Sequence, residues 1–161
     1  LLRTVSVQSA DERTQLVLAE AQLLRDAKRH DESYKLLSQA LAVAPDSVPL
    51  LYDTAMAAER LNQVAVMEKQ LRRIIELKPD YAEACNELGY ALRHVGQFPD
   101  SVKAYDEALR LKPRFPEALE YLGEAYVKMG QVEEARKVLE RLKPLDRKRA
   151  QELADEIAKA K

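Results

Sequence analysis

The sequence contains few of the residues on which most non-helical folds depend. Its 161 residues include four glycines, one cysteine, no tryptophan, seven tyrosines and two phenylalanines. So few glycines argue against a loop-rich fold, and so few aromatic residues argue against a β-sandwich core. A single cysteine excludes an internal disulfide and leaves the redox compartment open. No apolar run approaches the roughly 20 residues that a membrane-spanning helix needs, so direct membrane insertion is not expected.

The chain also lacks a surplus of either charge. It has 26 basic and 27 acidic residues, a net charge of −1. This balance argues against nucleic-acid binding, which needs a basic surplus to neutralise phosphates. The contents of 47% apolar and 33% charged residues indicate a soluble, folded chain rich in helix-forming residues. Because it begins with Leu1 rather than Met, we expect a processed or excised piece.

Three prolines recur at a fixed interval along the chain. Pro45, Pro79 and Pro113 are 34 residues apart, and each follows an apolar stretch with helical periodicity. Proline ends such a helix because it lacks the amide hydrogen that a helix interior needs. The interval predicts four repeats, at 14–47, 48–81, 82–115 and 116–145. They follow an N-terminal extension, 1–13, that is partly disordered or the remnant of a preceding repeat, and they precede a C-terminal capping helix, 146–161.

Small residues occupy the eighth position of every repeat. They are Ala21, Ala55, Gly89 and Gly123. Small side chains let two helix backbones approach closely, so each repeat is predicted to be an antiparallel pair of helices, A and B. Asp46 and Asp80 are expected to cap the next A helices.

The turn inside each repeat has a signal of its own. Gly96 and Gly130 stand at the end of helix A in the third and fourth repeats, where a left-handed backbone turns the chain. The corresponding residues of the first two repeats are Lys28 and Asn62. Asparagine tolerates that conformation, and lysine tolerates it less well.

With these features in place, the third repeat resembles a tetratricopeptide repeat. The residues that carry the resemblance are Leu88, Gly89, Ala91, Gly96, Tyr105, Ala108 and Pro113. The fourth repeat is similar through Leu122, Gly123, Tyr126, Gly130 and Ala135, but its Pro144 comes three residues early and should leave helix B short. The first two repeats match by spacing more than by identity, and the resemblance covers roughly residues 12–145. It implies an all-α fold, a right-handed solenoid of four helix pairs with a C-terminal cap.

The two ends of the chain differ. Residues 146–160 place five apolar side chains on one helical face, as a helix that seals a solenoid would: Ala150, Leu153, Ala154, Ile157 and Ala158. The segment 1–13 shows no helical period before about Ala10. The first helix A is therefore expected to leave an apolar edge uncovered, with Leu16 and Leu23 as candidates for self-association.

The resemblance also implies a binding surface. In the family it is the concave side, lined by the A helices, that holds partner segments. Transferred position by position, the candidate groove residues are Leu18, Gln22, Arg25, Tyr52, Met56, Arg60, Asn86, Tyr90, Arg93, His94, Glu120 and Glu124. Tyrosine and methionine are enriched at binding surfaces. With the basic residues beside them and an acidic stripe in the fourth repeat, the groove should suit a peptide of mixed charge.

Several more specific functions find little support. The lysines and asparagines with which chaperone-binding members hold a terminal carboxylate are absent, because only Asn86 is of a suitable type. Two histidines and Cys85 cannot assemble a zinc site by themselves. No phosphate-binding glycine loop or nucleophile motif occurs, so we expect no catalysis and no cofactor. A basic cluster opposed by Asp146 alone stands near the C-terminus: Arg141, Lys143, Arg147, Lys148 and Arg149.

The sequence thus predicts a non-catalytic scaffold that binds a protein or peptide partner. Two alternatives stay open. The chain could be a structural module that self-associates through its N-terminal repeat, or an interaction segment of a larger protein whose activity lies elsewhere. The family is abundant in several bacterial compartments, so cytoplasm and periplasm both stay open.

Overall fold

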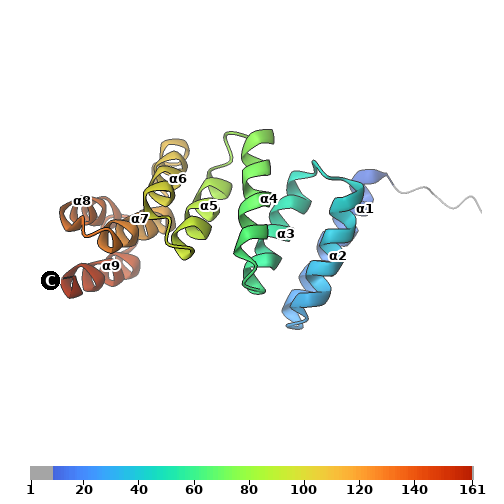
Figure 1. The fold of residues 1–161 in the computed structure, drawn as a ribbon, viewed down its shortest axis with the longest axis horizontal. Helices are drawn as coiled ribbons and strands as arrows, with labels where there is room; N and C mark the ends of the chain where they lie inside the picture. Colours follow the sequence, from blue (N-terminus) through green and yellow to red (C-terminus); the bar gives the residue numbers. More distant parts are fainter. Residues whose placement is uncertain (1–8, 161) are drawn as a thin grey trace, which may run out of the picture. The chain divides into compact units, whose positions relative to one another are not determined.

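The protein is all-α over the part that the computed structural model describes, residues 9–160. Those residues form nine α-helices and no β-strand. The helices are labelled in Figure 1. The helices are α1 (Ala10–Asp26), α2 (His30–Val43), α3 (Val48–Arg60), α4 (Val64–Leu77), α5 (Ala82–His94), α6 (Phe98–Leu111), α7 (Pro116–Lys128), α8 (Val132–Leu142) and α9 (Arg147–Lys159). The predicted all-α class is confirmed. Residues 10–13 belong to α1, and residues 1–8 of the predicted N-terminal extension lie outside the described part.

The chain forms two compact units. The first ends at Gln70 and the second begins at Leu71, so the boundary falls inside α4. Each unit has its own helix contacts, and each is described on its own.

Local sequence explains where several helices begin. The Ser9 hydroxyl accepts from the Glu12 amide at 3.1 Å while the Glu12 carboxylate accepts from the Ser9 amide at 2.9 Å, which closes a capping box at α1. Asp146 caps α9 by accepting from the Arg149 amide at 3.0 Å. The predicted caps Asp46 and Asp80 were wrong. Helices α3 and α5 begin one residue later along the chain, after Ser47 and Tyr81, and neither of these side chains makes a capping bond.

The four predicted turn positions all adopt the left-handed backbone. The φ angles are 60° at Lys28, 56° at Asn62, 80° at Gly96 and 71° at Gly130. The same conformation therefore ends helices α1, α3, α5 and α7, whether or not the residue is a glycine. The turn geometry belongs to the repeat, and the lysine and asparagine adopt it at some conformational cost.

In the first unit, α1, α2 and α3 enclose a small core. Its buried members are Ala21, Leu37, Leu50 and Ala57. The eighth-position residue Ala21 is fully buried, and its carbonyl oxygen accepts from the Ser33 hydroxyl of α2 at 3.0 Å. The outer side of α1 has no such cover among the described residues: Leu16 is 55% exposed and Leu23 is 69% exposed.

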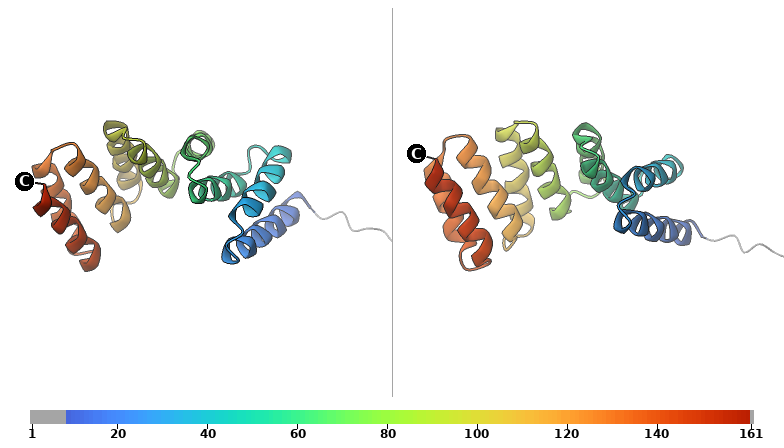
Figure 2. Two further views of the ribbon diagram at one scale, coloured as in Figure 1. Left: turned by 60° about the horizontal axis from the view of Figure 1, so that its bottom comes forward. Right: turned by 90° about the horizontal axis from the view of Figure 1, so that it is seen from below.

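In the second unit, α5 pairs with α6, α7 pairs with α8, and α9 packs against both α7 and α8 (Figure 2). The core includes Tyr105, Leu119, Leu122, Leu142 and Leu153. Helix α8 has 11 residues where α6 has 14, so the early Pro144 does leave it short.

Helix α9 covers the end of the second unit with the predicted face. Ala150, Leu153 and Ile157 are buried in the core that α7 and α8 also line. Ala154 is half-buried, and Ala158 is exposed, so the last residue of the predicted apolar face was wrong.

Candidate partner-binding surface

In the first unit, the six predicted groove residues lie on α1 and α3. Gln22 and Arg60 are exposed, while Tyr52 and Met56 are half-buried. Leu18 packs against the core of this unit, which leaves little of it for a partner. The Arg25 guanidinium donates to the Asp53 carboxylate of α3 at 3.0 Å, so its charge is already paired.

In the second unit, two of the six predicted residues are not accessible. Asn86 is fully buried and Glu120 is 5% exposed. The Asn86 amide lies 3.4 Å from the Glu87 carboxylate, and its carbonyl oxygen has no hydrogen-bond partner. The transfer of residues by repeat position predicted both as groove residues and was wrong about their exposure.

The remaining four residues of the second unit gather around an aromatic cluster on α5 and α7. The Tyr90 ring stacks on the His94 ring with centroids 6.1 Å apart, and on its other side it meets the Tyr121 ring at 5.9 Å. The Arg93 guanidinium lies 4.9 Å from the Tyr121 centroid and 5.8 Å from the Tyr90 centroid. These are cation–π distances, so Arg93 is held against both rings.

An ion pair fixes the same arginine from the other side. The Arg93 guanidinium donates to the Glu124 carboxylate of α7, and the two side chains are 20% and 26% exposed. Burial raises the pKa of Tyr121 to about 12, and the negative charges of Glu117 and Glu120 make smaller contributions to this rise. The phenol therefore stays neutral, and the cluster carries one paired cation rather than a free one.

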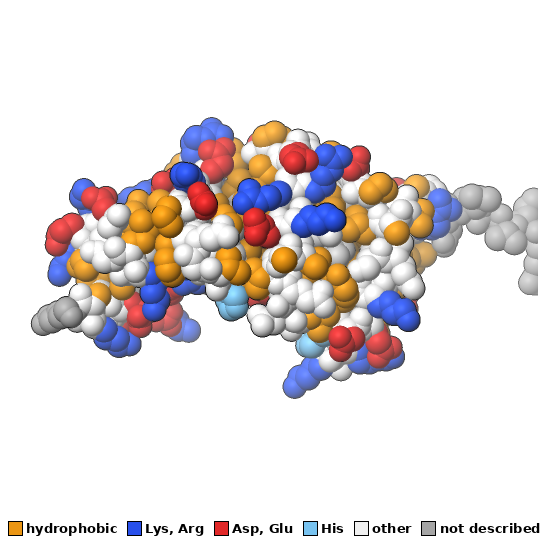
Figure 3. Space-filling view, viewed as in Figure 1, with side chains coloured by type: hydrophobic (Ala, Val, Ile, Leu, Met, Phe, Trp, Pro, Cys, Tyr) orange, Lys and Arg blue, Asp and Glu red, His pale blue; other side chains and the backbone are white. Residues whose placement is uncertain are grey.

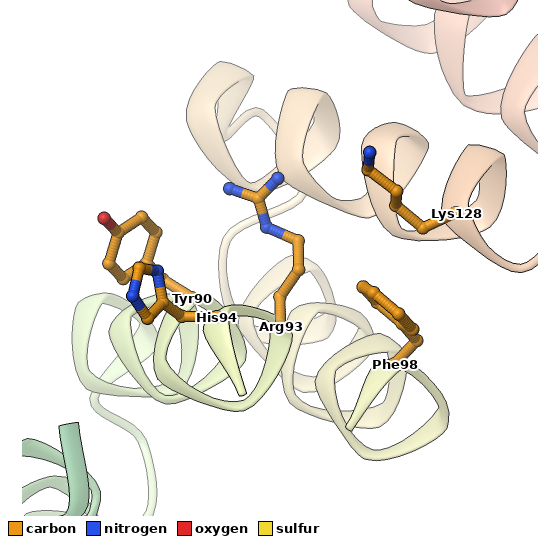
Figure 4. Close-up of a pocket in the computed structure, with 5 residues that line it drawn as sticks. All are labelled: Tyr90, Arg93, His94, Phe98 and Lys128. Carbon is orange, nitrogen blue, oxygen red and sulfur yellow. The ribbon is translucent and has the colours of Figure 1, made fainter. Parts of the chain in front are cut away.

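Beside this cluster lies an open pocket of about 230 Å³. It is lined by Tyr90, Arg93, His94, Phe98 and Lys128, which Figure 4 shows. Tyr90, Arg93 and His94 come from the last turns of α5, Phe98 begins α6, and Lys128 ends α7. In this view the Arg93 side chain lies between the Tyr90–His94 pair and the Phe98–Lys128 pair.

Two members of this surface were missed by sequence reasoning: Phe98, which lines the pocket, and Tyr121, which supports Arg93. Lys128 also lines the pocket, and it is one of the groove positions that the 34-residue interval does give, because it is equivalent to His94 one repeat earlier. Phe98 and Tyr121 lie outside the transferred positions, and only their aromatic character distinguishes them.

The predicted acidic stripe is largely neutralised. Glu124 pairs with Arg93, and the Arg149 guanidinium of α9 donates to Glu120. Burial raises the pKa of the Glu120 carboxyl, and the charge of Arg149 opposes that rise. The fourth repeat therefore presents less free negative charge than its sequence indicates.

Three of the five members of the predicted basic cluster are paired with carboxylates. Asp146 is not its sole counterpart: Lys143 pairs with Glu140 at 2.5 Å, Lys148 with Glu152 at 3.8 Å, and Arg149 with Glu120. On the face drawn in Figure 3, basic and acidic side chains lie next to one another rather than in separate patches. Most of these are i to i+3 or i+4 pairs on single helices, which contribute only a few tenths of a kcal/mol, about 0.2–0.5 each.

Features of other kinds of site were also sought among residues 9–160. No group of three or more His, Cys, Asp or Glu side chains there could hold a metal ion. Cys85 is buried, and burial raises the pKa of its thiol to about 11, which keeps it protonated and poorly nucleophilic. None of the helices in this range has the length and apolar character needed to cross a membrane.

These features define a helical-repeat protein with an open surface pocket in its second unit. Comparison with known proteins specifies the class further. Residues 92–158 match the model of the tetratricopeptide repeat family. Over 78 residues the chain is 40% identical to a TPR repeat-containing protein of Pseudomonas aeruginosa. The matched part is 48% of this chain and 13% of that relative, so the chain spans only a small part of its length.

Solved structures agree on the fold. A crystal structure of MamA protein aligns over 86% of this chain and 75% of its own, with a TM-score of 0.76 and 22% identity. A MamA RS-1 ArsTM double mutant aligns over 96% of both chains, with a TM-score of 0.78 and 16% identity. At such identities the likeness concerns the fold alone. The family match over residues 92–158 and the relative support an assignment to the tetratricopeptide repeat family, and the solved structures show a helical solenoid fold.

Proposed function

We propose that this protein is a non-catalytic scaffold that binds a peptide or segment of a partner protein on the faces of its A helices. The observation that carries the proposal is the half-buried aromatic and cationic surface of α5 and α7, which frames an open pocket. Membership of a family of interaction modules supports the same conclusion. Tyr52 and Met56 on α3 form the corresponding surface of the first unit.

Contacts within the protein already hold the side chains of this surface in place, which favours the binding of a partner segment. Arg93 is held by two tyrosine rings and by Glu124, and Tyr90 is held between His94 and Tyr121. Side chains that are already ordered lose little conformational entropy when a partner binds. Tyrosine and arginine are also the residues that most often dominate binding energies at protein interfaces.

A second candidate function is self-association through α1. The specific observation in its favour is the exposure of Leu16 and Leu23, which lie seven residues apart and so share one side of the helix. Apolar side chains of this size are stabilised by burial against a complementary surface, and each contributes about 1.5–3 kcal/mol when fully buried.

Affinity capture from a lysate of the source organism tests the main proposal. The baits are the wild-type chain and the triple variant Tyr52→Ala, Tyr90→Ala, Arg93→Ala. A matched control carries Lys35→Ala, Lys103→Ala and Arg136→Ala, three exposed positions on the B helices α2, α6 and α8. All baits are first checked for equal helical content by circular dichroism.

A partner retained by the wild type and the control but lost by the triple variant supports the A-helix surface. Equal capture by all three baits contradicts it and moves the interaction to another surface. Capture of the chain's own copies alone, abolished by Leu16→Ser with Leu23→Ser, would establish the self-association function in its place.

A further inference from the structure

Helix α1 has two apolar faces, and only one of them is used inside the first unit. Ala21 is fully buried in the core that α2 and α3 also line, and Val17 and Leu18 pack against the same core. On the opposite side of the helix, Leu16 is 55% exposed and Leu23 is 69% exposed. Among the described residues, no other helix has two large apolar side chains that are exposed in this way.

The exposed side of α1 has the spacing of a coiled-coil seam. Its exposed residues Glu12, Leu16, Ala19 and Leu23 follow one another at intervals of four, three and four residues. Side chains with this spacing form one stripe along a helix, and the element that packs on such a stripe is a second helix. The central Ala19 is small, so the axis of a second helix can come close.

The other end of the chain does not offer a matching surface. The exposed side chains of α9 are polar or charged except for that of Ala158. End-to-end stacking of α1 on the α9 of another copy would therefore bring Leu16 and Leu23 against charged groups. The apolar stripe that matches α1 in length and spacing is α1 itself in a second copy.

The charges of α1 favour an antiparallel orientation of that second copy. Asp11 and Glu12 lie in the first turn, and the exposed Lys28 follows the last turn. Within residues 9–160, Lys28 has no ion-pair partner. In an antiparallel pair, the acidic start of each helix lies near Lys28 of the other, and the two helix dipoles attract each other. A parallel pair would place like charges side by side.

We propose that two copies of the chain pair through α1 in an antiparallel arrangement, with a two-fold axis near Ala19. Leu16 of each copy then packs on Leu23 of the other. Such an interface uses the same patch on both copies, so it closes after two and does not grow into a filament. This pairing deepens the second candidate function, self-association, on which it rests. It also joins two A-helix surfaces, which would let the dimer bind a partner with two segments more tightly.

Glu20 opposes the pairing and limits its strength. It is exposed next to Ala19, at the edge of the stripe. In an antiparallel pair of helices the same edges meet, so the two Glu20 carboxylates face each other near the two-fold axis. Like charges at that distance repel. An interface with two leucines from each copy is also small, so we expect a reversible dimer that forms at micromolar concentrations. Glu20→Gln should tighten it severalfold.

Sedimentation equilibrium of the full chain, from micromolar to millimolar concentration, tests the pairing. The wild type should pass from the mass of one copy to that of two and no further. Leu16→Ser with Leu23→Ser should weaken the dimer by about a hundredfold or more, because it removes all four leucines from the interface. The matched control is Val43→Ser, which alters an 87% exposed side chain of α2 and should change nothing. Circular dichroism first confirms equal helical content.

A cross-link tests the orientation. Ala19→Cys places one thiol on each copy near the two-fold axis, and oxidised glutathione, which is reduced as the new disulfide forms, should join the copies covalently. The control Ala42→Cys places an exposed thiol on α2 and should give no such dimer. The native Cys85 is buried and should not react.

The outcomes separate the possible failures. A chain that stays monomeric at millimolar concentration overturns both the pairing and the second candidate function, and leaves this face of α1 to a different partner. Mass beyond two copies, a dimer that survives the leucine variant, or equal cross-linking of Ala19→Cys and Ala42→Cys overturns the antiparallel pairing alone. The A-helix surface is tested separately by the capture experiment, so its failure cannot be confused with either.

Discussion

Gly89 of α5 lies directly against the ring of Tyr105 on α6. A Cβ atom on Gly89 would come within 2.6 Å of Tyr105 Cε1 and within 2.8 Å of Cζ. The Tyr105 ring is fully buried, and it meets the Tyr121 ring with centroids 6.2 Å apart. Tyr121 in turn supports Arg93. The small residue of the third repeat therefore positions, through two aromatic rings, the arginine of the candidate binding surface.

Gly89→Ala should destabilise the protein by about 1–3 kcal/mol, the usual cost of overpacking a core. The buried Tyr105 ring cannot move away from the added methyl group unless α6 moves as well. Gly123→Ala is the matched comparison, because its Cβ would meet the terminal methyl groups of Leu153, which can change rotamer. Urea unfolding followed by circular dichroism should show the larger loss for Gly89→Ala. Equal losses would contradict the view that the rigidity of Tyr105 sets the cost.

Lys28→Gly should stabilise the chain by about 0.5–1 kcal/mol, because lysine at positive φ carries a steric cost of about 1–2 kcal/mol and glycine does not. Lys28 has φ of 60° in the turn between α1 and α2. Lys35→Gly is the control, since Lys35 is exposed in the interior of α2 and should lose about 1 kcal/mol. Thermal unfolding measures both. A loss of stability in Lys28→Gly would show that the lysine side chain has a role at this turn.

The repeat architecture was predictable because its signals are local. Proline ends helices, small residues permit close helix approach, and the left-handed turn falls at one position of the repeat even where Lys28 replaces glycine. Each of these signals is carried by one or a few residues, so it recurs every 34 residues and can be recognised in the sequence.

The candidate site was predicted only in part, because its charges are paired across helices. Arg93 reaches Glu124 and Arg149 reaches Glu120, partners that are 31 and 29 residues apart. The periodicity of one helix shows which side a residue occupies. It does not show that Asn86 is buried, or that an arginine from α9 pairs with a glutamate of α7.

Tyr105→Phe should reduce the loss of stability above pH 10 and leave stability at neutral pH unchanged or slightly higher. Burial raises the pKa of Tyr105 above its usual value, and Arg93 offsets part of the rise. A raised folded-state pKa gives stability that is complete below the unfolded-state value of about 10 and is lost as the pH rises beyond it. The buried hydroxyl also lacks a hydrogen-bond partner, so its removal costs little.

Urea unfolding at pH 8 and pH 11 checks this prediction. The wild type should lose more stability between the two pH values than Tyr105→Phe does. Some loss should persist in the variant, because burial also raises the pKa of Tyr121 and that of Cys85. An identical loss in both proteins would show that Tyr105 ionises as freely in the folded chain as in the unfolded one.

Arg149→Met should destabilise the protein by about 1–3 kcal/mol at pH 7, since it leaves the carboxylate of Glu120 buried without its partner. Arg149 is itself one-third exposed, which keeps the expected loss below that of a fully buried pair. Glu120→Gln should cost less, because the Arg149 guanidinium still reaches Asp146 at 3.5 Å.

The double variant Glu120→Gln, Arg149→Met should then lose less stability than the sum of the single variants, the mark of a direct interaction in a double-mutant cycle. The pH dependence gives an independent check. Burial already raises the pKa of Glu120, and without Arg149 it should rise further. The folded state of Arg149→Met then takes up a proton more readily than the unfolded state, so its deficit should shrink as the pH falls towards 4. Additive losses, with a deficit that is the same at pH 4 and pH 7, would show that Glu120 is stabilised by groups other than Arg149.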